Sequence, residues 1–187
     1  MQAMSTVARA PRLSSVLLQF VVWVVLGETA HARPAPSLCS ADEAVVFSCE
    51  FKGRSGARIA ALCASPAQAG EPPRVQYRFG TPRRIEFRFP STPQPLGELF
   101  WLSTTMYSGG GEARIRFRNA DTDYILFDAT TRTGFGGGPN NPQFTAGIAT
   151  RVDGKLTSVL KCSTSTPLAY GLLPGLKTED FEHDLMP

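Results

Sequence analysis

Strict alternation of apolar and polar residues in short segments is the feature that most constrains this fold. Residues 74–79, 84–89 and 113–118 each alternate in this way, and helical periodicity is nearly absent before residue 165. A period of two residues is typical of β-strands that bury one face. The Asp153-Gly154 pair, which lies between two such runs, predicts a two-residue β-hairpin turn.

About eight to nine such short segments follow one another at the spacing that is typical of antiparallel barrels and sandwiches. We therefore predict a single all-β domain over residues 33–187, an antiparallel barrel or sandwich, with a short irregular or helical tail over residues 163–187 that packs on it. Residues 98–107 and 122–129 contain runs that are apolar on both faces and need cover on both sides. The apolar segment 168–173 could cover one of these strands.

The first 32 residues have the organisation of a secretory signal peptide. Arg9 and Arg12 precede an apolar run over residues 16–27, and Ala30 and Ala32 form a small-x-small cleavage pattern. A run of this length is too short to cross a hydrocarbon core of about 30 Å as a helix. We therefore predict cleavage after Ala32, no stable membrane span in the mature chain, and a periplasmic or secreted location.

Four cysteines remain in the predicted mature chain, at positions 39, 49, 63 and 162. An even number of cysteines in an exported chain predicts two disulfides, for which three pairings are possible. The chain has no Cys-x-x-Cys pair, and its cysteine spacings match no structural zinc site. The sequence therefore predicts two disulfides, no metal site and no cofactor.

The register of the first predicted hairpin bears on how the cysteines pair. A hairpin centred near Arg54 would place Cys49 and Cys63 on the same strand face but about four residues out of register, roughly 13 Å apart at ~3.3 Å per residue. A disulfide needs Cα atoms within about 7 Å. This register disfavours a Cys49–Cys63 bridge. Of the two other pairings we favour Cys49–Cys162 with Cys39–Cys63, because Cys49–Cys162 would join the opening and closing strands of a barrel, while Cys39–Cys49 with Cys63–Cys162 is the alternative.

A glycine-rich segment, Tyr107-Ser108-Gly109-Gly110-Gly111-Glu112, lies directly before a predicted strand. A phosphate-binding loop needs Gly-x-x-x-x-Gly-Lys-Ser/Thr at the start of a helix, and here neither the lysine nor the helix is present. The sequence instead predicts a hairpin turn with positive φ. Because such tips are held out in solvent, these six residues also form a candidate binding loop.

Arginines are concentrated in the middle of the chain, whereas residues 177–184 carry four acidic residues and one lysine. Seven of the arginines fall on predicted strands: Arg74, Arg78, Arg84, Arg88, Arg114, Arg116 and Arg118. On neighbouring strands they could form one positive face that binds an anionic envelope component or a protein; an ordinary solvated face is the alternative. Nucleic acid is not predicted as a partner, because the aromatic residues fall on the opposite strand face and form no stacking platform among the charges.

Recognisable catalytic motifs are absent from the sequence. His183 is the one histidine that remains after the predicted cleavage, and there is no Gly-x-Ser-x-Gly motif. Five carboxylates could supply the catalytic pair of a hydrolase acting on an envelope polymer, which is the alternative from another class: Glu98, Glu112, Asp121, Asp123 and Asp128. Their spacing gives no reason to place two of them about a substrate, so we predict no catalytic residue.

The segments Phe47-Ser48-Cys49, Gln76–Gly80, Tyr107–Gly111 and Leu160-Lys161-Cys162 together resemble a group of small exported proteobacterial proteins that carries no assigned activity. More distantly, the chain is similar to the periplasmic and membrane-bound inhibitors of c-type lysozyme. Those are small antiparallel barrels in which an early strand ends in Phe-x-Cys and the last strand ends in cysteine. Ser108-Gly109 matches the start of their Ser-Gly-x-x-Tyr loop, with Glu112 in the position of the tyrosine.

Together these features predict an exported, disulfide-bonded, non-catalytic binding or envelope-associated protein. The resemblance implies a periplasmic lysozyme-inhibitor-like protein as a second possibility, and the carboxylates imply the hydrolase as a third.

The predicted signal peptide has a direct test. The exported protein should begin at Arg33, because Ala32 completes the cleavage pattern. The intact mass and the amino-terminal sequence of the exported chain measure this, and an exported chain that still begins at Met1 would contradict the prediction.

Overall fold

The structure, a computed structural model, describes residues 35–53, 56–66 and 70–183. All of these residues belong to one compact unit, Arg33–Pro187. The predicted signal peptide, residues 1–32, lies outside the described residues. In the described part of the chain no helix is both long and apolar enough to cross a membrane.

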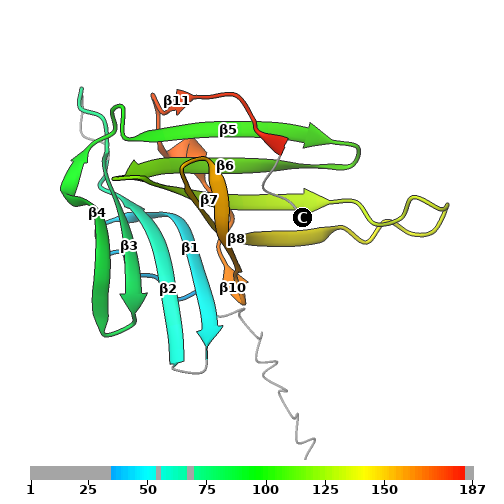
Figure 1. The fold of residues 1–187 in the computed structure, drawn as a ribbon, viewed down its shortest axis with the longest axis horizontal. Helices are drawn as coiled ribbons and strands as arrows, with labels where there is room; N and C mark the ends of the chain where they lie inside the picture. The colour runs from blue at the N-terminus through cyan, green and yellow to red at the C-terminus, as the bar shows by residue number, and fades with distance from the viewer. Residues whose placement is uncertain (1–34, 54–55, 67–69, 184–187) are drawn as a thin grey trace, which may run out of the picture. The chain divides into compact units, whose positions relative to one another are not determined.

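The described strands form two sheets that face each other, and the strands of one sheet cross those of the other (Figure 1). The first sheet has the order β10-β1-β2-β3-β4 and the second has the order β11-β5-β6-β7-β8-β9. The predicted all-β class is confirmed, and of the two predicted architectures the structure shows the sandwich and not a closed barrel.

Nine longer strands and two strands of two residues make up these sheets. The first sheet contains β1 (Ala44–Gly53), β2 (Gly56–Ala64), β3 (Arg74–Thr81), β4 (Arg84–Pro95) and β10 (Thr164–Ser165). The second contains β5 (Phe100–Tyr107), β6 (Gly110–Asn119), β7 (Thr122–Thr131), β8 (Gln143–Val152), β9 (Lys155–Lys161) and β11 (Lys177–Thr178). Every pairing is antiparallel except that of β11 with β5, which is parallel.

Two of the turns match their sequence signals. Asp153 and Gly154 join β8 to β9 with φ values of 49° and 74°, and a two-residue type I′ turn requires positive φ at both positions. Ser108 and Gly109 join β5 to β6, and Gly109 has a φ of 84°. The glycine-rich segment is therefore a hairpin turn, as predicted, and not a loop before a helix.

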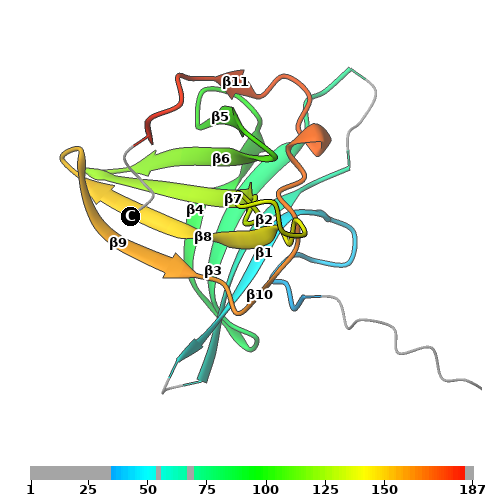
Figure 2. The ribbon, with the colours of Figure 1, turned by 90° about the vertical axis from the view of Figure 1, so that its right-hand side faces the viewer.

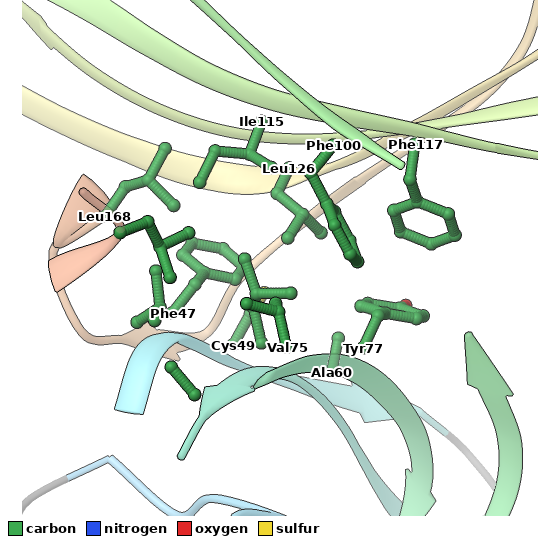
Figure 3. Packing of buried hydrophobic residues seen from close by; sticks show 14 of the residues in the cluster. Phe47, Cys49, Ala60, Val75, Tyr77, Phe100, Ile115, Phe117, Leu126 and Leu168 are labelled. Carbon is green, nitrogen blue, oxygen red and sulfur yellow. The ribbon is translucent and has the colours of Figure 1, made fainter. Parts of the chain in front are cut away.

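The core consists of the inward faces of both sheets (Figure 3). Tyr77 from β3 meets Phe117 from β6 with 4.8 Å between ring centroids. Phe117 also stacks on Phe89 from β4 at 4.7 Å and on Tyr124 from β7 at 4.9 Å. The alternation in these strands therefore directs aromatic rings from both sheets into one shared layer.

The predicted face of Cys63 is wrong, because the first hairpin pairs Gly53 with Gly56 and therefore Cys49 with Ala60, whereas a hairpin centred on Arg54 would pair Cys49 with Ile59. A shift of one residue reverses which face each side chain occupies. Cys49 and Leu62 therefore point into the core while Cys63 points outward, instead of Cys49 and Cys63 sharing a face.

The two disulfides join the pairs that the sequence analysis favoured. Cys49–Cys162, with Cα atoms 5.2 Å apart, lies where the chain leaves β9 of the second sheet and enters β10 of the first (Figure 2). Cys39–Cys63, with Cα atoms 5.4 Å apart, holds the segment before β1 against the outer face of the first sheet. One bridge therefore joins the two sheets, and the other secures the amino-terminal segment.

The tail after β10 packs on the sandwich, as predicted. Leu168 and Leu173 are buried in the core on either side of a short 3₁₀ helix, Tyr170–Leu172. The Ala169 N–H donates to the Val46 carbonyl, and the Leu168 N–H donates to Asp128. From there the chain continues to β11, which lies beside β5 (Figure 2).

Loss of the two disulfides should have unequal costs, because the loops that they close differ in length. The separations are 113 residues for Cys49–Cys162 and 24 residues for Cys39–Cys63. In the chain-entropy model, replacing both cysteines by alanine lowers the free energy of unfolding by about 5 kcal/mol for the first pair and about 3.5 kcal/mol for the second. Denaturant unfolding of the two double variants measures the difference. A larger loss from the shorter loop would show that another effect dominates.

Candidate binding site

The seven predicted arginines lie on two different sheets, so the prediction of one positive face is wrong. Arg74, Arg78, Arg84 and Arg88 belong to β3 and β4 of the first sheet, and the others to β6 of the second. Since the inward faces of the two sheets pack on each other, their outward faces point in opposite directions. Alternation along each strand correctly indicated outward side chains, but it could not tell which sheet a strand joins.

Arg78 on the first sheet is buried and has a structural role. Its guanidinium donates to both carboxylate oxygens of Glu43, at 2.6 and 2.7 Å, to Gln76 at 2.8 Å and to the Leu38 carbonyl at 3.0 Å. These bonds hold the segment before β1 on the sheet, next to the Cys39–Cys63 disulfide. Arg78 is thus occupied by its own chain and is not available to a partner.

The pKa of Glu43 is lowered by this arrangement. Burial alone would raise the pKa of this carboxyl, but the hydrogen bonds from Arg78 and from the Ser40 N–H outweigh it. The other three predicted site arginines of the first sheet, Arg74, Arg84 and Arg88, are exposed, and none of them forms an ion pair with a described residue.

The second sheet gathers its arginines around a cavity of about 300 Å³ on its outer face. Ile115 and Phe117 point into the core, so Arg114, Arg116 and Arg118 point outward. They are joined by Arg151 of β8, and we call these four residues the arginine site. The sequence analysis did not include Arg151, because β8 does not alternate clearly; its pairing with Asp123 on β7 brings it to this face.

The acidic end of the chain closes this cavity. Of the four acidic residues that line it, Asp123 comes from the sheet, whereas Glu179, Asp180 and Glu182 come from the tail. The charged cavity-lining residues that belong to the sheet are four arginines and one aspartate, with a net charge of +3 (+4 − 1 = +3). The lining residues of the tail add a charge of −3. The basic middle and the acidic tail of the sequence therefore contact each other within the protein. The uneven distribution of charge along the chain did not by itself reveal this contact.

Arg116 contacts two carboxylates and one aromatic ring in the site. It donates to Glu179 at 2.6 Å and to Asp123 at 3.1 Å, and its guanidinium lies 4.5 Å from the ring centroid of Trp101. The hydrogen bonds to Glu179 raise the pKa of this guanidinium against the lowering effect of burial. The Arg116 guanidinium therefore lies over an aromatic ring and binds carboxylates through its nitrogens.

Arg114 is almost completely buried. Its Nε donates to Glu112 at 2.5 Å, its Nη1 donates to the Glu182 carbonyl at 2.5 Å, and its guanidinium stacks on Phe181 at 3.9 Å. Its Nη2, also buried, has no hydrogen-bond partner within the described chain. Burying an N–H group of a charged side chain without an acceptor costs free energy. A ligand oxygen that accepted a hydrogen bond from this nitrogen would therefore bind favourably.

The other two arginines of the site differ in their contacts. Arg151 forms a short ion pair with Glu182. Arg118 is exposed, donates to the carbonyl of Ala120 at 3.2 Å and forms no ion pair with the described residues. The site thus combines arginines neutralised by the tail with one that faces solvent.

One part of the candidate binding loop is an exposed tip, and another part contacts the arginine site. Ser108 and Gly109 are exposed, but Glu112 is buried and accepts from both Arg114 and the Tyr107 hydroxyl, the latter at 2.8 Å. Burial and the bond to Glu112 raise the pKa of Tyr107 to about 12. Gly110 is needed for packing, since a Cβ there would lie 1.9 Å from the Thr130 carbonyl oxygen.

Four of the five candidate catalytic carboxylates of the alternative hydrolase bind separate partners. Glu98 pairs with Lys177 at 2.5 Å, Glu112 with Arg114, and Asp123 with Arg116. Asp128 accepts from the Leu168 N–H at 2.8 Å. Each of these four carboxylates thus contacts a different partner in its own chain.

Comparison with protein-family models, with curated proteins and with solved structures gives no match to this chain.

The contact between Arg78 and Glu43 predicts a dependence of stability on pH. Because the pKa of Glu43 in the folded state lies below its ordinary 4.5, ionised Glu43 stabilises the fold above that pH, and this contribution is lost as the pH falls below 4.5 through the lowered value. Glu43→Gln should therefore lower the free energy of unfolding by about 2 kcal/mol at pH 7. The difference from the wild type should shrink below pH 4.5, as measured by denaturant unfolding across pH.

Glu86→Gln is the matched control for that variant. Glu86 pairs with Arg58 at 3.4 Å on the same sheet, with both side chains about one third exposed, 36% and 35%. Such a pair contributes less than about 1 kcal/mol. A loss from Glu43→Gln that equals the control, or that does not change with pH, would contradict the assigned role of Glu43.

Proposed function

We propose that this protein is an exported, non-catalytic binding protein that holds anionic groups, carboxylates above all, in the arginine site of the second sheet. The observation that carries the proposal is the buried, unpartnered Nη2 of Arg114 in a cavity whose sheet residues carry an excess of positive charge. The two disulfides support export, because such bridges form and persist outside reducing compartments.

The chemistry of the site favours carboxylates. The carboxylates of Glu179 and Glu182 already bind Arg116 and Arg151, which shows that oxygen anions fit these guanidiniums. Arginine presents planar pairs of donors that match a carboxylate, and a partly enclosed cavity strengthens the interaction relative to open solvent. Trp101 holds the Arg116 guanidinium in place, so less conformational entropy is lost on binding.

The arginine site is a better candidate than the other two surfaces. On the first sheet, Arg78 is saturated by its own chain, and the exposed Arg84 and Arg88 are solvated. At the β5–β6 tip, the residue in the position of the lysozyme inhibitors' tyrosine is Glu112, which is buried and bonded to Arg114. Insertion of this tip into a partner's cleft is therefore less well supported than binding at the arginine site.

Arg118 gives the cleanest test of the proposed function. It lines the cavity and is exposed, so Arg118→Ser removes one ligand-accessible charge without opening the core. We expect this variant to bind fluorescently labelled poly-L-glutamate about fivefold more weakly than the wild type at low ionic strength, because one charge-assisted hydrogen bond contributes about 1 kcal/mol. Fluorescence anisotropy of the labelled polymer measures the affinity.

Arg88→Ser is the matched control, since Arg88 is also an exposed strand arginine but lies on the other sheet. It should change the affinity less than twofold, and added salt should weaken binding to the wild type. Equal losses from both variants, or no binding of the polymer at low salt, would refute the arginine site as the binding site.

A further inference from the structure

The acidic tail is bound to the second sheet in the manner of an added peptide strand. Lys177 and Thr178 pair in parallel with Trp101 and Leu102 of β5, and the Glu179 N–H donates to the Leu102 carbonyl at 2.9 Å. In the order of the sheet, β5 would be an edge strand without this segment. An open sheet edge that accepts an extended segment is a common mode of peptide recognition.

The side chains of this segment then occupy the arginine site one after another. Glu179 binds Arg116, and Phe181 stacks on Arg114. Glu182 binds both Arg114, through its main-chain carbonyl, and Arg151, through its carboxylate. The tail therefore supplies a backbone strand, two carboxylates and one aromatic ring to a surface that has a complementary group for each.

The segment itself contributes little to the core. Leu173 is the last buried residue of the tail, and Pro174-Gly175 follows, with Gly175 at a φ of 84°. None of the described residues after Leu173 is buried. Removing residues 177–183 from the sheet would therefore break ion pairs and one short strand pairing, but it would leave the aromatic core and both disulfides in place.

We propose that the segment Lys177–His183 is an internal competitor, and that the ligand of the arginine site is an extended acidic peptide of a partner protein. The ligand would pair with β5 and present carboxylate, aromatic and carboxylate groups in the order of Glu179, Phe181 and Glu182. This inference rests on the proposed function and names its ligand class. A tethered competitor has an effective concentration on the order of millimolar, so only a peptide with better complementarity or several attachment points displaces it.

The test uses the tail as its own probe. The chain truncated after Leu176 is mixed with a labelled synthetic peptide of residues 176–183, Leu-Lys-Thr-Glu-Asp-Phe-Glu-His. We expect saturable binding to the truncated chain, and binding at least about tenfold weaker to the full chain, in which the tethered tail occupies the site. The same peptide with Glu179→Gln and Glu182→Gln should bind the truncated chain at least about tenfold more weakly than the parent peptide.

Correct folding of the truncated chain is checked by far-UV circular dichroism and by non-reducing mass analysis for both disulfides. If truncation prevents folding, the full chain with Glu179→Gln and Glu182→Gln replaces it, because this variant keeps the strand and Phe181 but loses both carboxylates. It should bind the parent peptide at least about tenfold more tightly than the wild type does.

The outcomes separate this inference from the proposed function. If the truncated chain, or its replacement, binds poly-L-glutamate but does not bind the tail peptide, the arginine site binds anions but is not a strand-acceptor site, and the inference is wrong. Equal affinity of the tail peptide for the open variant and the full chain also overturns it. If neither probe binds the open variant, both the inference and the proposed function fail.

Discussion

The contact of Phe117 with aromatic rings of both sheets is the interaction on which the rest of this structure depends. Phe117 meets Tyr77 and Phe89 of the first sheet and Tyr124 of its own, all with centroid distances under 5 Å. Because side chains alternate along a strand, fixing Phe117 inward turns Arg116 and its neighbours at every second position outward. The core thereby sets the position of the charged surface as well as the packing of the sheets.

On each sheet, acidic residues of a segment outside the long strands bind some of the outward-facing arginines, but the two segments are held in different ways. On the first sheet, a segment before β1 delivers Glu43 to Arg78 and is secured by the Cys39–Cys63 disulfide. On the second sheet, the tail delivers Glu179 and Glu182, and no covalent bridge holds this described segment. The first contact is therefore part of the permanent fold, whereas the second can open without loss of a disulfide or of a buried apolar side chain.

This difference directs attention to the second sheet as the functional face. A buried guanidinium nitrogen on Arg114 without an acceptor shows that the tail does not fully satisfy the surface that it covers. A ligand that supplied one more oxygen there, while keeping the strand pairing with β5, would bind more favourably than the tail does. The proposed external peptide would therefore have one contact to gain at Arg114 that the tail does not make.

The features that depend on residues close together in the chain could be predicted from the amino-acid order. Alternation around Phe117 predicted the strands and their outward arginines, Asp153-Gly154 predicted the hairpin between β8 and β9, and cysteine spacing favoured Cys49–Cys162. These succeeded because side-chain period, turn conformation and the limited reach of a disulfide are local or nearly local properties.

Local patterns could not predict which strands share a sheet or which residues cover the arginines, and both became visible in the folded chain. The register of the first hairpin, in which Cys49 pairs with Ala60, placed Cys63 on the outer face, and the assignment of β3 and β6 to opposite sheets divided the arginines into two groups. Contact between Glu179 and Arg116, which are 63 residues apart, arises from the path of the tail beside β5. Which strands pair, and where a distant segment docks, depend on packing interactions across the whole core. A local sequence pattern does not contain that information.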